Sequence, residues 1–279
     1  MKEVPQWSAK EVSRTLPRRD SDSHKGTFGT ALLIAGSPGM PGAAALSAIG
    51  AMRSGLGKLV VATAKGSIPT IASFVPEATF EPDLLERMAS TPPDFRIYRA
   101  IAIGPGIIPD QAMTYAVESL LTQGKPLVID AGALAPRNYS TASAPVILTP
   151  HQAEFSRITG VPVEDLQHNR ADYASEWAEK LEVAIVLKGN NTVIAFPDGK
   201  TFINPTGNSS LAKGGTGDTL TGMMLGMLCC HDNWQHAVLN AVHLHGACAD
   251  EWTRTRSAHT LVAHELTDLL PVVMKSYEQ

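Results

Sequence analysis

The sequence predicts an α/β protein with a doubly wound, mostly parallel β-sheet and helices on both of its faces. Short apolar runs of strand length alternate with helical segments along the chain. Loops rich in Gly and Pro separate them in the order strand, loop, helix, strand, which builds parallel βαβ units with right-handed crossovers. Neither an internal repeat nor a Gly/Ser linker interrupts this order. We therefore expect residues 1–279 to form a single domain.

The first βαβ unit occupies the N-terminal part of the chain. A Ser-x-x-Glu capping box predicts a short helix over 8–16. The apolar run 30–36 predicts a buried strand, and 43–54, which is small and apolar throughout, predicts a helix packed closely on the sheet. Glycines 55 and 57 end that helix, and 58–63 is the next predicted strand.

The same pattern continues to the C-terminus. An Asp-Gly turn at 198–199 predicts a β-hairpin over 192–203. The last part of the chain is apolar with helical spacing. The remaining predicted elements are strands over 100–104, 126–130, 146–150 and 183–187, and helices over 110–122, 171–181, 222–228, 234–250 and 263–274.

Composition restricts the class of protein. A chain of 279 residues with 44% hydrophobic content can bury a large core, and its formal charge of −4 gives no reason to expect nucleic acid or an anionic membrane as partner. The three cysteines match neither zinc spacing nor a disulfide framework, which favours buried thiols in a reducing compartment. The N-terminus has no signal-peptide h-region and no segment is long and apolar enough to span a membrane, so we expect a cytoplasmic protein.

The stretch 204–222 is the most unusual part of the sequence. It holds five glycines and leads directly into an apolar run. Glycines allow backbone N–H groups to converge, and the start of a helix adds free N–H groups and the positive end of its dipole, so the stretch predicts an anion site. It matches neither a Walker loop nor a dinucleotide fingerprint. Asp218 lies at the mouth of the helix, where it either faces a substrate or simply caps a flexible loop.

Other unusual residues also follow predicted strands. Because ligands of such sheets bind at the carboxyl ends of the strands, these loops predict a cleft. His151 follows a proline there and is expected to be accessible, whereas Lys213 is either a second phosphate contact or a solvated lysine. His231, His243 and His245 have no partners at metal spacing, so we predict no metal site there. The loops are 36–42, 104–106, 130, 149–151, 188–192 and 204–218.

Taken together, these motifs resemble the ADP/ATP-dependent NAD(P)H-hydrate dehydratase family, which has the ribokinase-like fold. The resemblance extends from about residue 20 to residue 275, although the Gly-Gly-Thr-Gly-Asp motif alone is shared by many ribokinase-like enzymes. The motifs are Lys25–Gly29, Gly36–Ala44, Arg53–Gly57, Gly104–Gly106, Asp130–Leu134, Thr149–Phe155, Lys188–Thr192 and Gly214–Gly222.

The resemblance implies a repair reaction in which a nucleotide, ADP or ATP, is consumed to remove water from hydrated NADH or NADPH. It implies Asp218 as the catalytic base, and an anion hole formed by Gly215, Thr216 and Gly217. By the same resemblance, the implied substrate contacts are Ala43, Gly106, His151 and Asp218, and the implied nucleotide contacts are Lys188, Gly189, Asn190, Asn191, Thr192 and Gly217.

The resemblance also implies Mg²⁺ on the nucleotide phosphates and a homo-oligomer, a tetramer. The sequence departs from the family pattern in three places. Gly132 replaces a usual aspartate, Ile107-Ile108 replaces Leu-Gly, and Ala153 replaces a frequent glycine. The first departure leaves Asp130 as the only acid of its loop and puts any phosphate, metal or water contact of that loop in doubt.

Two other functions share some of these features. A small-molecule kinase of the same fold, acting on a hydroxymethylpyrimidine, a thiazole alcohol or a sugar, would use the same glycine loop and Asp218 but release a phosphorylated product. Recovery of NADH absorbance from hydrated NADH distinguishes the dehydratase from this kinase. A different class of function is a nucleotide-sensing or structural protein that has lost catalysis, and the Asp218→Asn variant distinguishes it from an enzyme.

Overall fold

The computed structural model describes residues 4–278, and its centre is one nine-stranded sheet with the strand order β3-β2-β1-β4-β5-β6-β7-β8-β9. Strands β1 to β7 are parallel, and β7, β8 and β9 pair antiparallel. The predicted doubly wound, mostly parallel sheet is therefore confirmed. The strands are β1 Thr30–Ile34, β2 Lys58–Thr63, β3 Thr79–Pro82, β4 Ala100–Ile103, β5 Leu127–Ile129, β6 Val146–Leu148, β7 Ala184–Leu187, β8 Val193–Ala195 and β9 Thr201–Ile203.

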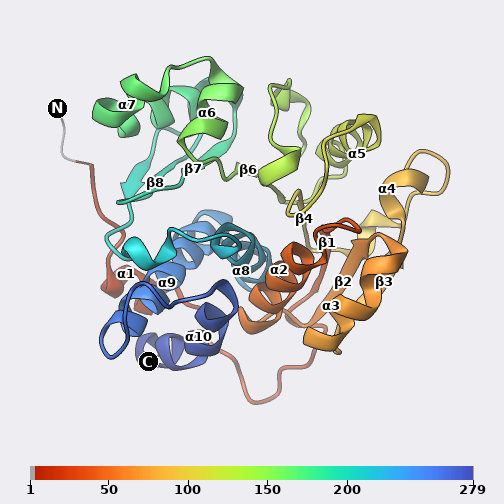
Figure 1. Cartoon of the computed structure of the whole chain (residues 1–279), viewed down its shortest axis with the longest axis horizontal. Helices are drawn as coiled ribbons and strands as arrows, with labels where there is room; N and C mark the ends of the chain where they lie inside the picture. The colour runs from red at the N-terminus through yellow and green to blue at the C-terminus, as the bar shows by residue number, and fades with distance from the viewer. Residues whose placement is uncertain (1–3, 279) are drawn as a thin grey trace.

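Helices cover both faces of the sheet (Figure 1). One face carries α2, α3, α8, α9 and α10, and the other carries α4, α5, α6 and α7. The helices are α1 Ala9–Thr15, α2 Pro41–Arg53, α3 Ile68–Phe74, α4 Leu84–Arg87, α5 Gln111–Leu121, α6 Gln152–Thr159, α7 Val163–Leu181, α8 Thr216–Cys230, α9 Trp234–Thr253 and α10 Ala263–Tyr277.

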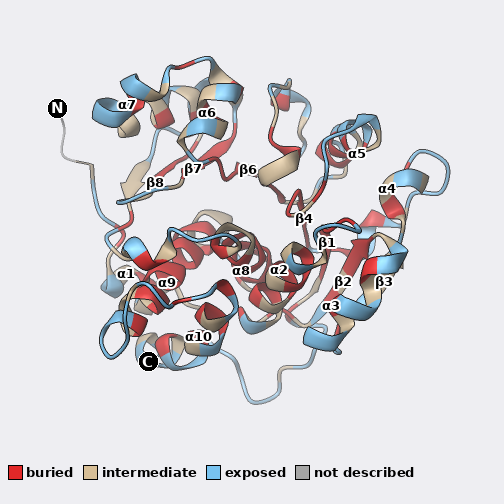
Figure 2. Ribbon diagram, in the orientation of Figure 1, coloured by how far each residue is buried: buried red, intermediate tan, exposed pale blue. Residues whose placement is uncertain are grey.

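The central strands are buried on both sides, as their uninterrupted apolar runs predict. In β1, Leu33 packs in the core on the α8 face and Leu32 in the core on the opposite face. Helix α8 is buried along nearly its whole length, and it lies between the sheet and its neighbouring helices (Figure 2). A helix that is apolar all round needs such a position.

Close packing of α2 against α8 depends on residues without large side chains. At Gly222 an added Cβ would lie 1.9 Å from the backbone oxygen of Ser47, and at Gly50 it would lie 2.6 Å from the oxygen of Thr219. Small residues therefore let the two backbones approach to a distance that any other residue would prevent. This contact fixes where α8 begins relative to the sheet.

The structure corrects the predicted elements in four places. No element was predicted over 64–99, which contains α3, β3 and α4; these are short, and β3 is an edge strand without an apolar run. Helix α6, whose sequence is mostly polar, was not predicted either. Helix α7 begins at Val163 rather than at residue 171, with a kink at Asn169. Helix α8 begins at Thr216 rather than at residue 222, because Gly215 provides its N-terminal cap position. As a result Asp218 lies in the first turn of α8.

The cysteines are free, with Cys229 and Cys248 buried and Cys230 partly buried, as predicted. Of the helices between residues 4 and 278, none combines the length and the apolar character that crossing a bilayer requires.

Candidate active site

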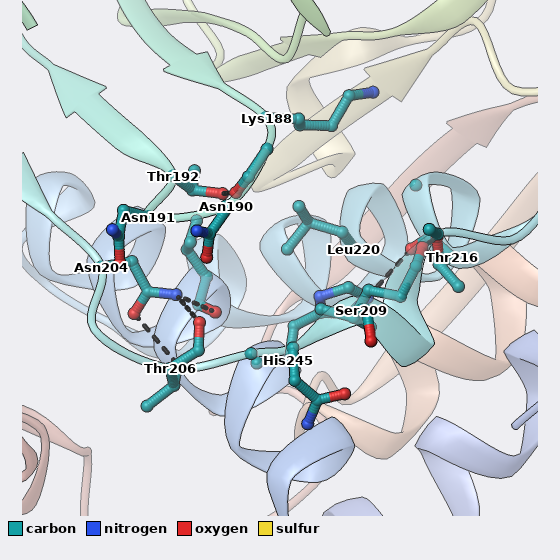
Figure 3. A pocket seen from close by; sticks show the side chains of 18 residues that line it. Lys188, Asn190, Asn191, Thr192, Asn204, Thr206, Ser209, Thr216, Leu220 and His245 are labelled. Atoms are coloured by element: carbon teal, nitrogen blue, oxygen red, sulfur yellow. Dashed lines mark hydrogen bonds between the residues drawn. The ribbon is translucent and has the colours of Figure 1, made fainter. Parts of the chain in front are cut away.

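The larger of two adjoining cavities has a volume of about 550 Å³ and lies between the loop after β7 and the segment that leads into α8. This volume lies in the range of about 300–1,000 Å³ that is typical of small-molecule sites. Figure 3 shows Asn204 and Thr206 on one side of the cavity and Thr216 and Leu220 on the other. All the residues predicted to bind the nucleotide line it: Lys188, Gly189, Asn190, Asn191, Thr192 and Gly217.

The second cavity, of about 380 Å³, contains Asp218. Asp130 and His151 line it as well, at the carboxyl ends of β5 and β6. The residues that line both cavities are Lys188, Gly189, Thr216 and Gly217. The two spaces therefore meet at the first turn of α8, with Asp218 in the second one.

The first turn of α8 has the geometry of an anion site. Gly215 has φ +91°, and a Cβ there would lie 2.6 Å from Leu46 Cδ1, so glycine is required. No side chain caps this helix end in the described structure, and the N–H groups of the first turn lack helical partners. At Gly217 an added Cβ would lie 3.4 Å from Lys188 Nζ. Free amides, the helix dipole and a cation thus converge on one point.

Lys188 forms an ion pair with Asp130, 2.9 Å from Nζ to Oδ1. Thr149 Oγ1 and Thr221 Oγ1 also donate hydrogen bonds to the Asp130 carboxylate, at 2.7 and 2.8 Å. Burial by itself would raise the pKa of Asp130, but the charge of Lys188 and these hydrogen bonds outweigh it and hold the pKa below its ordinary value. Asp130 is therefore a buried, fully bonded anion that holds Lys188 in place.

The Asp218 carboxyl has a different environment. Burial and, to a smaller extent, the nearby Asp130 charge raise its pKa, Lys188 partly opposes them, and the result is a pKa of about 7. Two carboxyl groups of one site thus have pKa values shifted in opposite directions, which makes the group with the raised pKa the candidate for acid–base chemistry. A base with a pKa near neutral pH can accept a proton and release it again.

His151 is the N-cap residue of α6 rather than a free side chain. Its Nδ1 accepts hydrogen bonds from the N–H groups of Ala153 and Glu154, at 3.1 and 3.3 Å. Its side chain remains 56% exposed, as the sequence predicted, and lines the 380 Å³ cavity. Because Nδ1 is the acceptor, Nε2 carries the proton, and it lies 3.5 Å from Glu154 Oε2.

Ala43 and Gly106 adjoin this region without lining either cavity. Gly106 has φ +66°, and an added Cβ there would lie 2.7 Å from the Cβ of Ala43. The hydroxyl of Ser47 donates to the backbone oxygens of Ala43 and Asp218, at 3.0 and 2.9 Å. This contact joins α2 to the first turn of α8. Ala43 and Gly106 therefore pack beside the first turn of α8, and their role as substrate contacts stays a prediction.

One departure from the family pattern, Gly132, has a steric reason in this structure. An added Cβ at Gly132 would lie 2.2 Å from the backbone oxygen of Ile107. An aspartate therefore does not fit at 132 while the loop after β4 follows its present course.

Sequence reasoning missed several residues that shape the site. Arg170, on α7, donates to the oxygens of Leu187 and Asn190 on either side of Lys188, and no local pattern indicates this. His245 lines the 550 Å³ cavity and donates from Nε2 to the backbone oxygen of Thr216 at 3.0 Å; burial lowers its pKa to about 4.

Lys213 contacts the backbone oxygen of His259 and lines neither cavity. Its expected role as a second phosphate contact therefore gains no support.

The fold and the site together define an enzyme of the ribokinase-like class, with a glycine-capped helix that faces a nucleotide-sized cavity and an acid in its first turn. A structure from Enterococcus faecalis, described as a ribokinase-like superfamily protein, covers 100% of this chain and 98% of its own with TM-score 0.88 at 28% identity. A family model, NAD(P)H-hydrate dehydratase, matches residues 31–272. The chain belongs to this family.

Two similar proteins from Bacillus subtilis make the relationship more specific. One is a curated ADP-dependent (S)-NAD(P)H-hydrate dehydratase, 60% identical over 99% of both chains. The other is a crystal structure of ADP/ATP-dependent NAD(P)H-hydrate dehydratase co-crystallised with ATP and Mg²⁺, which covers 100% of both chains with TM-score 0.97 at 59% identity.

Proposed function

We propose that Asp218 and the first turn of α8 carry out the nucleotide-dependent dehydration of the S-form of hydrated NADH or NADPH, which is the activity of this family. ADP or ATP is consumed, and AMP or ADP and phosphate are released. The observation that carries the proposal is that the two cavities meet at Gly217, with the nucleotide residues in one and Asp218 in the other. Similarity to the Bacillus subtilis dehydratase supports it.

Hydroxide is a poor leaving group, so the ring hydroxyl is first phosphorylated. Asp218 accepts the hydroxyl proton while the hydroxyl oxygen attacks the terminal phosphorus of the nucleotide, and the bond from that phosphorus to the bridging oxygen breaks. The lone pair of the ring nitrogen then expels phosphate from the adjacent carbon. The neighbouring carbon loses a proton, which restores the dihydronicotinamide double bond.

We infer that the amides of Gly215, Thr216 and Gly217 form an anion hole for this step, because N–H groups at the start of a helix have no helical partners. Lys188 adds a positive charge that its pairing with Asp130 keeps in position. His151 offers Nε2–H to the substrate, and Ala43 and Gly106 form the adjoining surface. Lys188 to Thr192 enclose the nucleotide.

A magnesium ion is compatible with these residues. Within residues 4–278 no three His, Cys, Asp or Glu side chains are grouped as metal ligands, and Asp130 is already occupied by Lys188, Thr149 and Thr221. Mg²⁺ usually keeps several waters and binds through substrate phosphates, which requires few protein ligands. When bound in that way it would neutralise charge on the nucleotide phosphates.

The rival function, a small-molecule kinase of the same fold, is not favoured. It accounts for the glycine loop and Asp218 equally well, but the family and its full-length relative are dehydratases. We also infer a single domain, supported by the continuous nine-stranded sheet, and a cytoplasmic homo-oligomer, supported by the family resemblance alone.

The proposal is tested by replacing the base. We expect Asp218→Asn to lower kcat by about 10²–10⁴-fold, because the asparagine amide cannot accept the hydroxyl proton. The measurement is recovery of absorbance at 340 nm from hydrated NADH with ADP or ATP. Asp172→Asn, on the exposed side of α7, is the matched control and should leave the rate unchanged. A loss of less than about tenfold in Asp218→Asn would show that another group is the base.

A further inference from the structure

A third cavity, of about 180 Å³, lies at the same edge of the sheet, and none of the proposed site residues lines it. Its walls come from the ends of β1 and β2, from α4 and from the loop after β4. It is smaller than the roughly 300–1,000 Å³ of a site for a whole ligand, so it suits one part of a larger molecule.

Two buried hydroxyls without partners line this cavity. Ser37 and Thr63 are 8% and 5% exposed, and neither Ser37 Oγ nor Thr63 Oγ1 has a hydrogen-bond partner among the described residues. Gly36 leaves space beside them, since an added Cβ there would lie 2.9 Å from Thr63 Oγ1. Buried hydroxyls are normally hydrogen-bonded, so these two are available to a polar ligand.

The negative charge at the rim of the cavity determines which polar groups it can bind. Glu86 and Asp110 are exposed there, and no lysine or arginine lines the cavity. Carboxylates accept hydrogen bonds from sugar hydroxyls, as in other dinucleotide sites, and repel phosphate. The lining therefore suits a neutral, hydroxyl-bearing group.

The position of the cavity relates it to Asp218. Strand β1 lies two places from β5 in the sheet, and β5 ends at Asp130, so the two sites are about 10 Å apart along the edge. Gly106 lies between them. A Cβ added there would be 3.3 Å from the Cα of Gly36, which lines the cavity, and 2.7 Å from the Cβ of Ala43, which is near Asp218. One extended dinucleotide can occupy such an edge across several strands.

We propose that this cavity binds the ribose of the adenosine half of hydrated NADH, and that Glu86 and Asp110 disfavour the 2′-phosphate of hydrated NADPH. This inference rests on the proposed function, because Asp218 fixes the nicotinamide half at the other site. Ser37 and Thr63 contribute hydroxyl contacts, and the acidic rim sets the preference between the two substrates.

The first test removes the two hydroxyls. We expect Ser37→Ala and Thr63→Val each to raise KM for hydrated NADH about two- to tenfold, the range for one lost neutral hydrogen bond, with kcat and the KM for ADP unchanged. KM for hydrated reduced nicotinamide mononucleotide, which lacks the adenosine half, should not change. Thr201→Val is the matched control, because Thr201 Oγ1 is also buried without a partner but lies on β9 at the far edge of the sheet.

The second test neutralises the rim. Glu86→Gln and Asp110→Asn should lower KM for hydrated NADPH about two- to fivefold relative to hydrated NADH, since each removes a repulsive charge. Asparagine at 110 can still accept the hydrogen bond that Asp110 accepts from the Met113 N–H group, so α5 stays capped.

Unchanged KM for hydrated NADH in both hydroxyl variants would mean that the cavity holds only water, and would overturn the inference. Equal changes for the dinucleotide and the mononucleotide would also overturn it, because the variants would then disturb the Asp218 site. An unchanged preference in the rim variants would overturn the assigned selectivity. A wild-type protein inactive on every hydrate would instead refute the proposed function.

Discussion

Asp130 and Asp218 belong to one site but perform different tasks because their surroundings differ. Asp130 accepts hydrogen bonds from two threonines and pairs with Lys188, so it stays charged. Asp218 is half-buried beside that charge, and its pKa is raised to about 7. Asp218 therefore gains and loses its proton near neutral pH, whereas Asp130 stays charged and holds Lys188 in position.

These two pKa shifts predict a pH dependence. The carboxylate form of Asp218 is the proposed base, so kcat/KM should rise with pH and level off above a midpoint near pH 7. Asp130→Asn should move this midpoint to lower pH, because it removes a like charge and frees Lys188 to stabilise the Asp218 anion. The measurement is the pH–rate profile of both proteins. A midpoint that stays or moves upward would contradict this account.

At the scale of single elements, α8 determines the geometry of the site. Its first turn carries the amides and Asp218, and its middle packs against α2 through Gly222. The Ser47 hydroxyl on α2 donates a hydrogen bond to the backbone oxygen of Asp218, so the contact between the helices extends to the turn that carries Asp218. A small change in the α2–α8 distance would therefore move Asp218.

Gly222→Ala tests the importance of this contact. The added methyl group would lie 1.9 Å from the Ser47 oxygen, so the helices must separate. We expect the free energy of unfolding to fall by about 1–3 kcal/mol, and kcat to fall as well. Urea unfolding measures the first quantity. Gly66→Ala is the control, because nothing lies within 4 Å of its added Cβ; equal stability of the two variants would refute the packing argument.

At the scale of the whole molecule, a buried neutral histidine joins the end of α8 to hydrogen bonds between α9 and the N-terminal segment. Because a backbone carbonyl can only accept, His231 Nδ1 donates to the Met227 oxygen at 2.9 Å, and Nε2 accepts from Asn240. Asn240 in turn accepts from Trp7 Nε1 at 2.9 Å. Burial lowers the pKa of His231 to about 4, below the ordinary 6.5, so the folded state keeps this histidine neutral.

A lowered histidine pKa makes stability depend on pH. The unfolded state binds more protons between pH 6.5 and about 4, so the contribution is complete above pH 6.5 and is lost as pH falls through that window. For His231 it is on the order of 3 kcal/mol. Urea unfolding at pH 7 and pH 4.5 should show His231→Gln less stable than wild type at pH 7 but with a smaller loss on acidification. Parallel losses would contradict this role.

Much of the fold could be predicted because its signals are local. Apolar runs between Gly and Pro loops define the central strands, and the Asp-Gly turn defines the hairpin of β8 and β9. The short edge elements between 64 and 99 gave weak local signals and were missed. The nucleotide loop 188–192 could be located from its place after a strand, but its support by Arg170 could not, since that residue lies on another element.

The sequence by itself determined the fold class, the loops at the carboxyl edge of the sheet and the acid at the mouth of the glycine helix. Those features depend on residue spacing and turn chemistry within one segment. Tertiary structure alone decided that Lys188 pairs with Asp130, 58 residues away, and that the two cavities meet at Gly217. It also decided that Asp218 has a raised pKa, because burial and neighbouring charge exist only once distant strands and helices have packed together.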